Sequence, residues 1–399
     1  SYFEKYNKEF KRLEFKSGEK IFDWEVPLEW NIKDAFIKDE RGRKIVDFQK
    51  NNLHVVGYSE QIDEIINLND LQNHLHSLPS QPNAIPYITS YYSRNWGFCI
   101  SHEQRKSLKN GKYHVKIDSE LKKGVMNYAD LIIKGKSSKE IFLSTYICHP
   151  SMANNELSGP LVSTALAKWV NNLKDPFYTY RFVFIPETIG SIAYLSQHLE
   201  HLKRNVIAGF NITCIGDNRC YSFMPSRNGN TLSDRVGKHV VSSIDPNYKE
   251  YSWLDRGSDE RQYCSPGVDL PIASIMRSKY DDYPEYHTSL DDLSLISPDG
   301  LEGGLNALSK AIEALEFNCY PVLKVLGEPQ LGKRDLYPAF STKESGDKVR
   351  VILDLLTYSD GKIDLIEIAE RINCPIWDLY ELVENLVGKK LLTVSKEPK

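Results

Sequence analysis

Two histidines and a glutamate stand where the sequence predicts that strands or loops end at one edge of a sheet. His149 follows the β-type run IFLSTYI, and Glu187 follows the similar run RFVFIP. His287 lies in SKYDDYPEYHTSLDDL, a loop rich in acids and tyrosines. Ligands of open α/β sheets bind at the carboxyl ends of the strands, and zinc prefers imidazole nitrogens together with a carboxylate. The three residues therefore predict a catalytic zinc centre.

Each of these residues also has a structural interpretation. A histidine at a strand end can simply be packed there, and Glu187 can be an acid that the helix dipole favours at a helix N-terminus. Asp217 ends a further predicted strand and is another candidate metal ligand. Asp259 and Glu260, in RGSDERQYCSPGVDLP, can be ligands, can orient a zinc-bound histidine, or can be surface acids. The occurrence of histidines and acids together at several strand ends favours the metal centre.

Arginines near the same segments suggest how a substrate is held. Arg227 and Arg277 can each form paired hydrogen bonds with a substrate carboxylate, and Tyr286, beside His287, is expected to contact the substrate. The sequence has no GxSxG, GxxxxGK[ST], HExxH or strand-following GxGxxG motif, and these mark the commonest competing chemistries. Metal-assisted hydrolysis is therefore the leading interpretation.

Three zones of different composition must position these residues. Residues 21–135 contain short β-type runs between Gly, Pro and Asn turns, which predicts an inserted, mainly β domain. From Ile141, strands alternate with amphipathic helices as far as a helix that runs from Gly300 toward Phe317. This alternation predicts a mixed, mostly parallel sheet flanked by helices over residues 136–335. Residues 1–20 are predicted to be a helical part of the same α/β domain.

The third zone, residues 342–399, predicts three helices followed by an extended segment, which is the order of a winged helix. The segment in the position of the recognition helix carries Asp378, Glu381 and Glu384, and the zone holds 9 Lys and Arg against 11 Asp and Glu. An acidic reading helix repels phosphates. We therefore expect no nucleic-acid binding, and instead protein docking or homo-oligomer formation through this domain.

The composition excludes several classes of protein. The chain of 399 residues has 50 Lys and Arg against 54 Asp and Glu, a formal net charge of -4, which argues against a polyanion-binding surface. No stretch approaches the roughly 20 apolar residues that a membrane span needs, and the charged start is unlike a secretory signal. The seven cysteines are scattered and never spaced as CxxC, which indicates buried thiols rather than disulfides or a thiolate zinc site. We expect a cytoplasmic protein with no membrane association.

The motifs CHPSMANNELSGP, PETIGS, TCIGD, GSDERQY and EYHTSLDD resemble those of the aminopeptidase-like proteins encoded among polysaccharide-biosynthesis genes. That group is related to the zinc aminopeptidases, which include the bacterial leucyl aminopeptidases and share their fold with glutaminyl cyclases. The resemblance covers nearly the whole chain and implies an aminopeptidase-like α/β fold with an inserted β-rich domain and a C-terminal winged helix. Position by position, it implies that His149 and His287 are zinc ligands and that Glu187 is the general base.

The sequence departs from the zinc aminopeptidases at three acidic ligands. The bridging aspartate corresponds to Asn155, the acid beside the general base to Thr188, and the strand-end aspartate to Thr213, with Asp217 as the nearest replacement. Two dications close together need such negative charge to offset their repulsion. We therefore expect one zinc ion or none.

The leading expectation is a zinc-dependent, aminopeptidase-like hydrolase that cleaves an amide with a metal-bound water as the nucleophile. Its substrate is expected to be a small molecule, a peptide or an aminoacyl group, including one linked to a sugar of polysaccharide biosynthesis. The lost acidic ligands support an alternative, a catalytically silent peptidase fold that binds or scaffolds. A third interpretation, a winged-helix regulator that senses a ligand in the α/β domain, is disfavoured by the acidic third helix.

Overall fold

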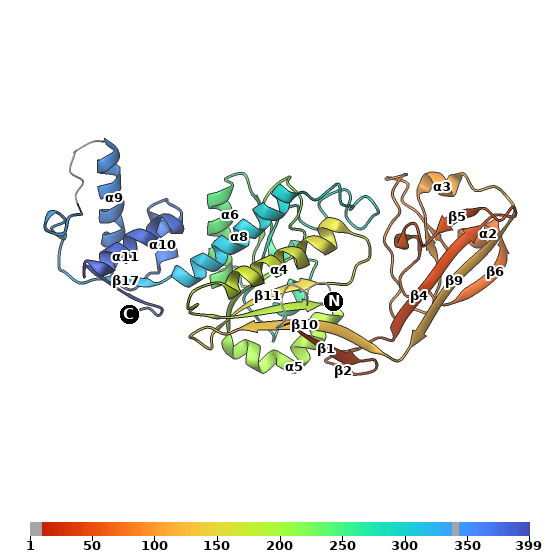
Figure 1. Cartoon of the computed structure of the whole chain (residues 1–399), viewed down its shortest axis with the longest axis horizontal. Helices are drawn as coiled ribbons and strands as arrows, with labels where there is room; N and C mark the ends of the chain where they lie inside the picture. Colours follow the sequence, from red (N-terminus) through yellow and green to blue (C-terminus); the bar gives the residue numbers. More distant parts are fainter. Residues whose placement is uncertain (1–9, 337–342) are drawn as a thin grey trace.

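A mixed eight-stranded sheet forms the centre of the computed structural model, which describes residues 10–336 and 343–399 (Figure 1). In order across the sheet, the strands are β1 (Lys11–Lys16), β10 (Val125–Ile133), β12 (Thr179–Ile185), β11 (Glu140–Tyr146), β13 (Val206–Asn211), β16 (Ile272–Met276), β14 (Ser222–Met224) and β15 (Lys249–Glu250). The four strands β12, β11, β13 and β16 are parallel neighbours. Antiparallel pairs flank them on both sides. The carboxyl ends of β11 and β12 therefore meet at the same edge.

Helices cover both faces of this sheet. β11 and β12 are buried along their full length, as expected for parallel strands between two layers. One face carries α4 (Ser158–Asn171), α6 (Leu232–Ile244) and α8 (Pro298–Phe317), and the other carries α5 (Ile189–Asn205) and α7 (Glu260–Tyr263). On α8, the buried side chains include Ala307, Leu308, Ala311 and Leu315, the inner face that the sequence predicts. The predicted α/β fold class is confirmed.

The N-terminal segment is a strand where the sequence predicted a helical part over residues 1–20. β1 pairs antiparallel with β10, and Phe15 is its buried residue within KRLEFK. Pairing along β10 outweighs any helical preference of so short a segment. The helical prediction is therefore wrong for residues 11–16, and residues 1–9 lie outside the described residues. Because β10 belongs to the central sheet, the β-rich insertion also ends earlier than residue 135.

The insertion is a separate β domain with its own hydrophobic core. Its antiparallel sheet has the order β5 (Lys44–Asp47), β4 (Glu29–Lys38), β9 (Lys112–Lys122) and β6 (Ile62–Asn67). Its short elements are η1 (Asn52–His54), α2 (Leu68–Gln72), β7 (Leu75–His76), β8 (Phe98–Cys99) and α3 (His102–Lys106). The short hairpin of β2 (Lys20–Ile21) and β3 (Trp24–Glu25) lies beside α5 on the α/β domain. Figure 1 shows this domain beyond one end of the central sheet, joined to it through the long strands β9 and β10.

The C-terminal domain lies at the opposite end of the molecule (Figure 1). It consists of β17 (Tyr320–Leu323), α9 (Lys343–Thr357), α10 (Leu365–Arg371), η5 (Ile376–Leu379), α11 (Tyr380–Gly388) and β18 (Leu392–Ser395). β17 and β18 pair antiparallel. The guanidinium of Arg235 on α6 bonds both oxygens of Asp364 at 2.8 and 2.5 Å, and the Ile376 N–H donates to Nε2 of His239 at 2.9 Å. The winged helix is therefore docked on the α/β domain, with which it shares one hydrophobic core.

Across the described ranges, no helix combines the length and the apolar character that a membrane crossing requires.

Candidate metal centre

His149 is held in the loop between the end of β11 and η2 (Ala153–Leu157), a turn of π-helix that leads into α4. Oε2 of Glu156 accepts hydrogen bonds from the His149 backbone N–H at 3.0 Å and lies 3.2 Å from its Nδ1. Both side chains are buried. Because Glu156 occupies the Nδ1 side, Nε2 of His149 is the nitrogen that faces Glu187, whose Oε2 lies 3.5 Å away. A carboxylate on one imidazole nitrogen commonly orients the other toward a metal.

Glu187 stands in a tight turn between β12 and α5. Its N–H donates to Sγ of Cys148 at 3.3 Å, and the next residue, Thr188, has a left-handed backbone with φ of 62°. A Cβ on Gly190 would lie 2.6 Å from the Ile185 side chain, so glycine is needed for α5 to begin this close to the strand. Burial, and then the charge of Asp259, raise the pKa of Glu187 to about 8. Such a carboxyl group can exchange protons near neutral pH.

His287 brings the second imidazole to the same place. The centroids of the His149 and His287 rings are 5.2 Å apart, and the Tyr286 ring stacks on His287 at 3.9 Å. Within the described part of the chain, Nε2 of His287 is buried without a hydrogen-bond partner. Burial lowers the pKa of both imidazoles to about 4, so both are neutral at neutral pH, the form that binds metal.

The inserted domain reaches into this site. The N–H of Tyr87 donates to the His287 carbonyl at 2.9 Å, and the Ser289 N–H donates to the Ile85 carbonyl at 2.8 Å. The Tyr87 ring packs edge-on against both histidine rings, with centroid distances of 5.2 Å. One wall of the site therefore comes from a different domain than the histidines.

Neutral groups stand beside the histidines at Asn155 and Thr213, two of the positions where the resemblance to zinc aminopeptidases would place acids. Nδ2 of Asn155 donates to the Tyr146 hydroxyl at 2.8 Å, and that hydroxyl lies 2.6 Å from Oγ1 of Thr213. The Tyr146 ring packs 5.3 Å from that of His149. Oδ1 of Asn155 is buried and has no partner among the described residues. The network carries no formal charge to balance a second dication.

Asp217 and Glu260 do not join the histidines. The oxygens of Asp217 accept hydrogen bonds from Asn154, Arg219 and Ser278 at 2.8 to 3.0 Å. The oxygens of Glu260 accept from four further groups, the Gly257 and Ser258 N–H groups, the Tyr280 hydroxyl and the Asn211 amide. Asp217 was expected as a metal ligand. All its hydrogen-bonding capacity is used within the chain, so it instead holds neighbouring loops together.

Asp259 acts on Glu187 through the turn between them. Its Oδ1 accepts from the Thr188 N–H at 2.7 Å and from the Ser191 hydroxyl at 2.8 Å. Its Oδ2 is buried and has no partner within the described residues. Asp259 is therefore buried rather than a surface acid, and these contacts hold the turn after Glu187 rather than a histidine.

The two arginines expected to bind substrate are engaged elsewhere. Arg227 forms an ion pair with Asp269. Arg277 is buried, donates to the Asp217 carbonyl at 2.9 Å and to Oδ1 of Asn218 at 2.7 Å, and lies over the Tyr221 ring. Tyr286, the third expected substrate contact, packs on His287. Neither Arg227 nor Arg277 is therefore available for a substrate carboxylate, because sequence proximity to the site did not bring either guanidinium to it.

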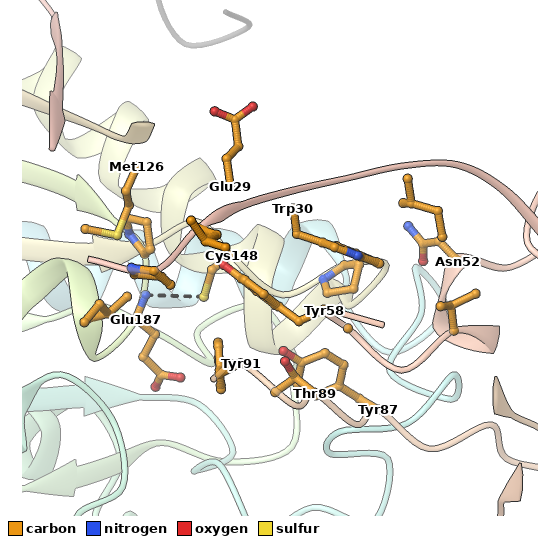
Figure 2. Close-up of a pocket in the computed structure, with 18 of the residues that line it drawn as sticks. Glu29, Trp30, Asn52, Tyr58, Tyr87, Thr89, Tyr91, Met126, Cys148 and Glu187 are labelled. Carbon is orange, nitrogen blue, oxygen red and sulfur yellow. Dashed lines mark hydrogen bonds between the residues drawn. The ribbon is translucent and has the colours of Figure 1, made fainter. Parts of the chain in front are cut away.

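A cavity of 420 Å³ opens beside Glu187 and Cys148 (Figure 2). Its walls come from both domains and include five aromatic residues, Trp30, Phe48, Tyr58, Tyr87 and Tyr91. Figure 2 shows Cys148 and Glu187 at one side of the cavity and Trp30, Tyr58 and Tyr87 toward the other. The cavity leads to the carboxyl group that faces His149.

Sequence reasoning missed Cys148, Glu156 and Tyr87. Ligand atoms of Cys148, His149 and Glu156 lie within 4.8 Å of one another, a spacing that can hold a metal. Since Oε2 of Glu156 already accepts the His149 N–H, we assign Glu156 to orientation. Its position seven residues after His149, just before a helix, is a signal that the sequence offered. No local signal marked Tyr87.

The fold places this chain in the class of aminopeptidase-like α/β proteins. The family model described as Domain of unknown function (DUF4910) matches residues 4–318, and a winged helix-turn-helix model matches residues 318–394. The chain belongs to the DUF4910 family, and the winged helix expected from the sequence is confirmed.

Known relatives agree with this assignment. A Clostridium acetobutylicum protein, provisionally named a polysaccharide biosynthesis protein with aminopeptidase-like domain, is 41% identical over 361 residues, covering 90% of this chain and 82% of its own. The crystal structure of a provisionally named peptidase from Clostridium acetobutylicum is 38% identical, has a TM-score of 0.91 and covers 98% of this chain and 90% of that one. A zinc aminopeptidase from Bacillus subtilis has a TM-score of 0.55 at 12% identity, over 78% of this chain and 85% of that one, and so shows the fold alone. The resemblance drawn from the motifs is confirmed.

Proposed function

We propose that this protein hydrolyses an amide bond, with one zinc ion held by His149 and His287 and with Glu187 as general base. One observation carries the proposal. Nε2 of His149 faces the Glu187 carboxyl group at 3.5 Å, beside a second imidazole whose Nε2 is buried and unpaired among the described residues. An unpaired buried nitrogen costs free energy, and a metal would satisfy it.

The donor set fits zinc. Two neutral imidazoles and a neighbouring carboxyl group match the ligands of catalytic zinc sites, and Asn155 offers an unpaired oxygen as a further candidate ligand. When bound, zinc would polarise the amide carbonyl and make water more acidic. The neutral network of Asn155, Tyr146 and Thr213 supports one ion rather than two.

The chain's own residues would carry the proton. Glu187 would accept a proton from the water that attacks the carbonyl carbon and pass it to the departing amine nitrogen. Burial raises the pKa of Glu187, which favours the protonated form that holds the proton between the two steps. Glu156 would keep His149 oriented, and the rings of Tyr87 and Tyr286 would exclude bulk water from the imidazoles. We propose a peptide or an aminoacyl group as substrate.

Replacing Glu187 with Gln tests the role of the base. The shape is kept and the base is lost, so turnover of aminoacyl and peptidyl nitroanilides should fall by roughly 10²–10⁴ while zinc stays bound. Glu140→Gln is the matched control, because Glu140 is a buried carboxylate at the other end of β11, paired with Arg181. Loss of zinc in Glu187→Gln would instead make Glu187 a ligand and move the base to Asp259.

A second candidate function is a peptidase fold without catalysis. The neutral groups at Asn155, Thr188 and Thr213 favour it, because each replaces an acid of the related enzymes. Under this alternative the wild type binds its ligand and hydrolyses no member of an aminoacyl, peptidyl and N-acyl-sugar panel, even with zinc present.

We propose that the winged helix serves docking rather than DNA binding. Asp378, Glu381 and Glu384 are exposed at the position of the recognition helix, and the domain is held to α6 through Arg235 and Asp364. Gel-shift titration with random duplex DNA should show no binding at physiological salt, and micromolar binding with a steep salt dependence would contradict this. Self-association through the same domain stays a prediction, to be checked by light scattering of the full chain.

A cytoplasmic location is also proposed. The structure describes all seven cysteines, and all are free thiols, as is usual in a reducing compartment.

A further inference from the structure

We propose that the aromatic cavity between the inserted domain and the α/β domain binds an uncharged saccharide ring. The inference rests on the proposed function, because a sugar held there would present an attached amide to Glu187. The cavity of 420 Å³ has Glu187 and Cys148 in its wall on the α/β side and Trp30, Tyr58 and Tyr91 in its wall on the inserted-domain side. It is large enough for one or two sugar rings.

The aromatic wall is built as a platform. The rings of Trp30 and Tyr58 stack at an interplanar angle of 16° with centroids 5.9 Å apart, and the Tyr91 ring lies 5.5 Å from that of Tyr58, tilted by 49°. The indole N–H of Trp30 donates to the Ser59 carbonyl at 2.9 Å, which fixes the orientation of that ring. The C–H faces of sugar rings are apolar and pack on aromatic faces, while their hydroxyls need polar partners at the edge. Asn52 and Thr89 line the same cavity and can supply them.

The charge of the lining disfavours an anionic ligand. Among the described residues that line the cavity there is no Lys, Arg or His, so phosphate, sulfate and carboxylate groups find no cation there. The oxygens of Glu29 already accept hydrogen bonds from Nδ2 of Asn31 and from the Val125 N–H. Figure 2 shows the Glu29 carboxylate pointing away from the aromatic side chains. On the inserted-domain side, no carboxylate is turned toward the aromatic rings; the other carboxyl group of the lining, that of Glu187, lies in the wall on the α/β side.

Backbone strain marks the same residues. Tyr58 and Tyr91 have left-handed backbones, with φ of 67° and 41°, a conformation that aromatic residues rarely adopt and that asparagine tolerates better. Tyr91 is also 46% exposed, so its ring is not retained to fill a core. Strained conformations of this kind cluster at binding sites, where they place a side chain. The two tyrosines thus make the platform at the expense of local stability.

The strain supplies a test that separates binding from folding. Tyr58→Asn and Tyr91→Asn each remove one ring and relieve the left-handed backbone. Tyr91→Asn, at a side chain that is 46% exposed, should keep or gain thermal stability, whereas Tyr58→Asn also loses the packing of its ring on Trp30 and should fold with a modest loss. Titration calorimetry of the full chain with N-acetylglucosamine, N-acetylgalactosamine and N,N′-diacetylchitobiose, in the presence of a chelator, should show wild-type binding to at least one sugar. That binding should weaken at least tenfold in both variants.

Phe22→Asn is the matched control. Phe22 is an aromatic residue with φ of 53° and 57% exposure that does not line the cavity. The same substitution there should relieve strain and leave sugar affinity unchanged.

Two results would overturn the proposal: absence of wild-type binding to all three sugars, or wild-type affinity in both platform variants. Because the titration uses metal-free protein and no turnover, it is independent of the proposed function. Sugar binding without any amide hydrolysis would support the saccharide site and contradict the proposed hydrolase. Peptide hydrolysis without sugar binding would support the hydrolase and contradict the saccharide site.

Discussion

Replacing Glu156 with Gln tests whether this buried side chain positions His149. The amide of Gln still offers an oxygen to the His149 N–H, which Glu156 accepts at 3.0 Å, so the backbone hydrogen bond is kept. Burial raises the pKa of Glu156 to about 8, and the substitution removes the ability of this group to become a carboxylate beside Nδ1 when a zinc ion binds at Nε2. Removing a partner of this kind lowers metal affinity by roughly 10–100-fold. At about 1.4 kcal/mol for each factor of ten, the loss is roughly 1.4–2.8 kcal/mol of binding free energy.

The effect should appear in thermal unfolding with and without zinc. Free zinc at about 100 times the wild-type Kd stabilises the wild type by about 2.7 kcal/mol. At the same free zinc, a 10–100-fold weaker site gains only about 0.4–1.4 kcal/mol. Glu140→Gln should lose stability, since Glu140 pairs with Arg181 at 2.7 Å, yet keep the full response to zinc. A wild-type zinc response in Glu156→Gln would refute the positioning role.

Three further changes test other parts of the account. Asn155→Asp places a carboxylate in the neutral network beside His149, so zinc affinity or stoichiometry should rise in chelator competition; no change would put Asn155 away from the metal. Asp364→Ala leaves Arg235 unpaired at the domain interface and should cost roughly 3–5 kcal/mol, seen in calorimetry as earlier unfolding of the winged helix. Burial lowers the pKa of His239 to about 4, below its unfolded value of about 6.5. Below pH 6.5 the unfolded chain therefore takes up a proton that the folded chain does not, and about 3 kcal/mol of stability is lost by pH 4, a loss that His239→Gln should reduce in pH-dependent urea unfolding.

The parts of the site that sequence could predict lie at the ends of buried strands. The sequences of β11 and β12 are largely continuous apolar runs, because both faces of these strands are covered. The ends of the two runs therefore predicted that His149 and Glu187 lie at one edge of the sheet. The helix α8 was equally clear, because Ala and Leu recur along its buried face. The apolar runs and the helical spacing of Ala and Leu are local features of the sequence, and these predictions rest on them.

The parts that failed depend on tertiary contacts. Tyr87 reaches the site because its N–H pairs with the carbonyl of His287, 200 positions later in the chain, which no local pattern encodes. Arg277 is buried and donates to a backbone carbonyl. The sequence around it does not distinguish it from an arginine that binds a carboxylate. Asp217 was proposed as a ligand for the same reason, since sequence does not show that its oxygens are already used.

Metal analysis of protein purified without added metal tests the central claim most directly. Inductively coupled plasma mass spectrometry of the wild type, His149→Ala and His287→Ala would give the zinc bound per chain. The account predicts about one zinc in the wild type and a large loss in each variant, because each removes one of only a few ligands. Two zinc ions per wild-type chain, or one ion that persists in both variants, would contradict it.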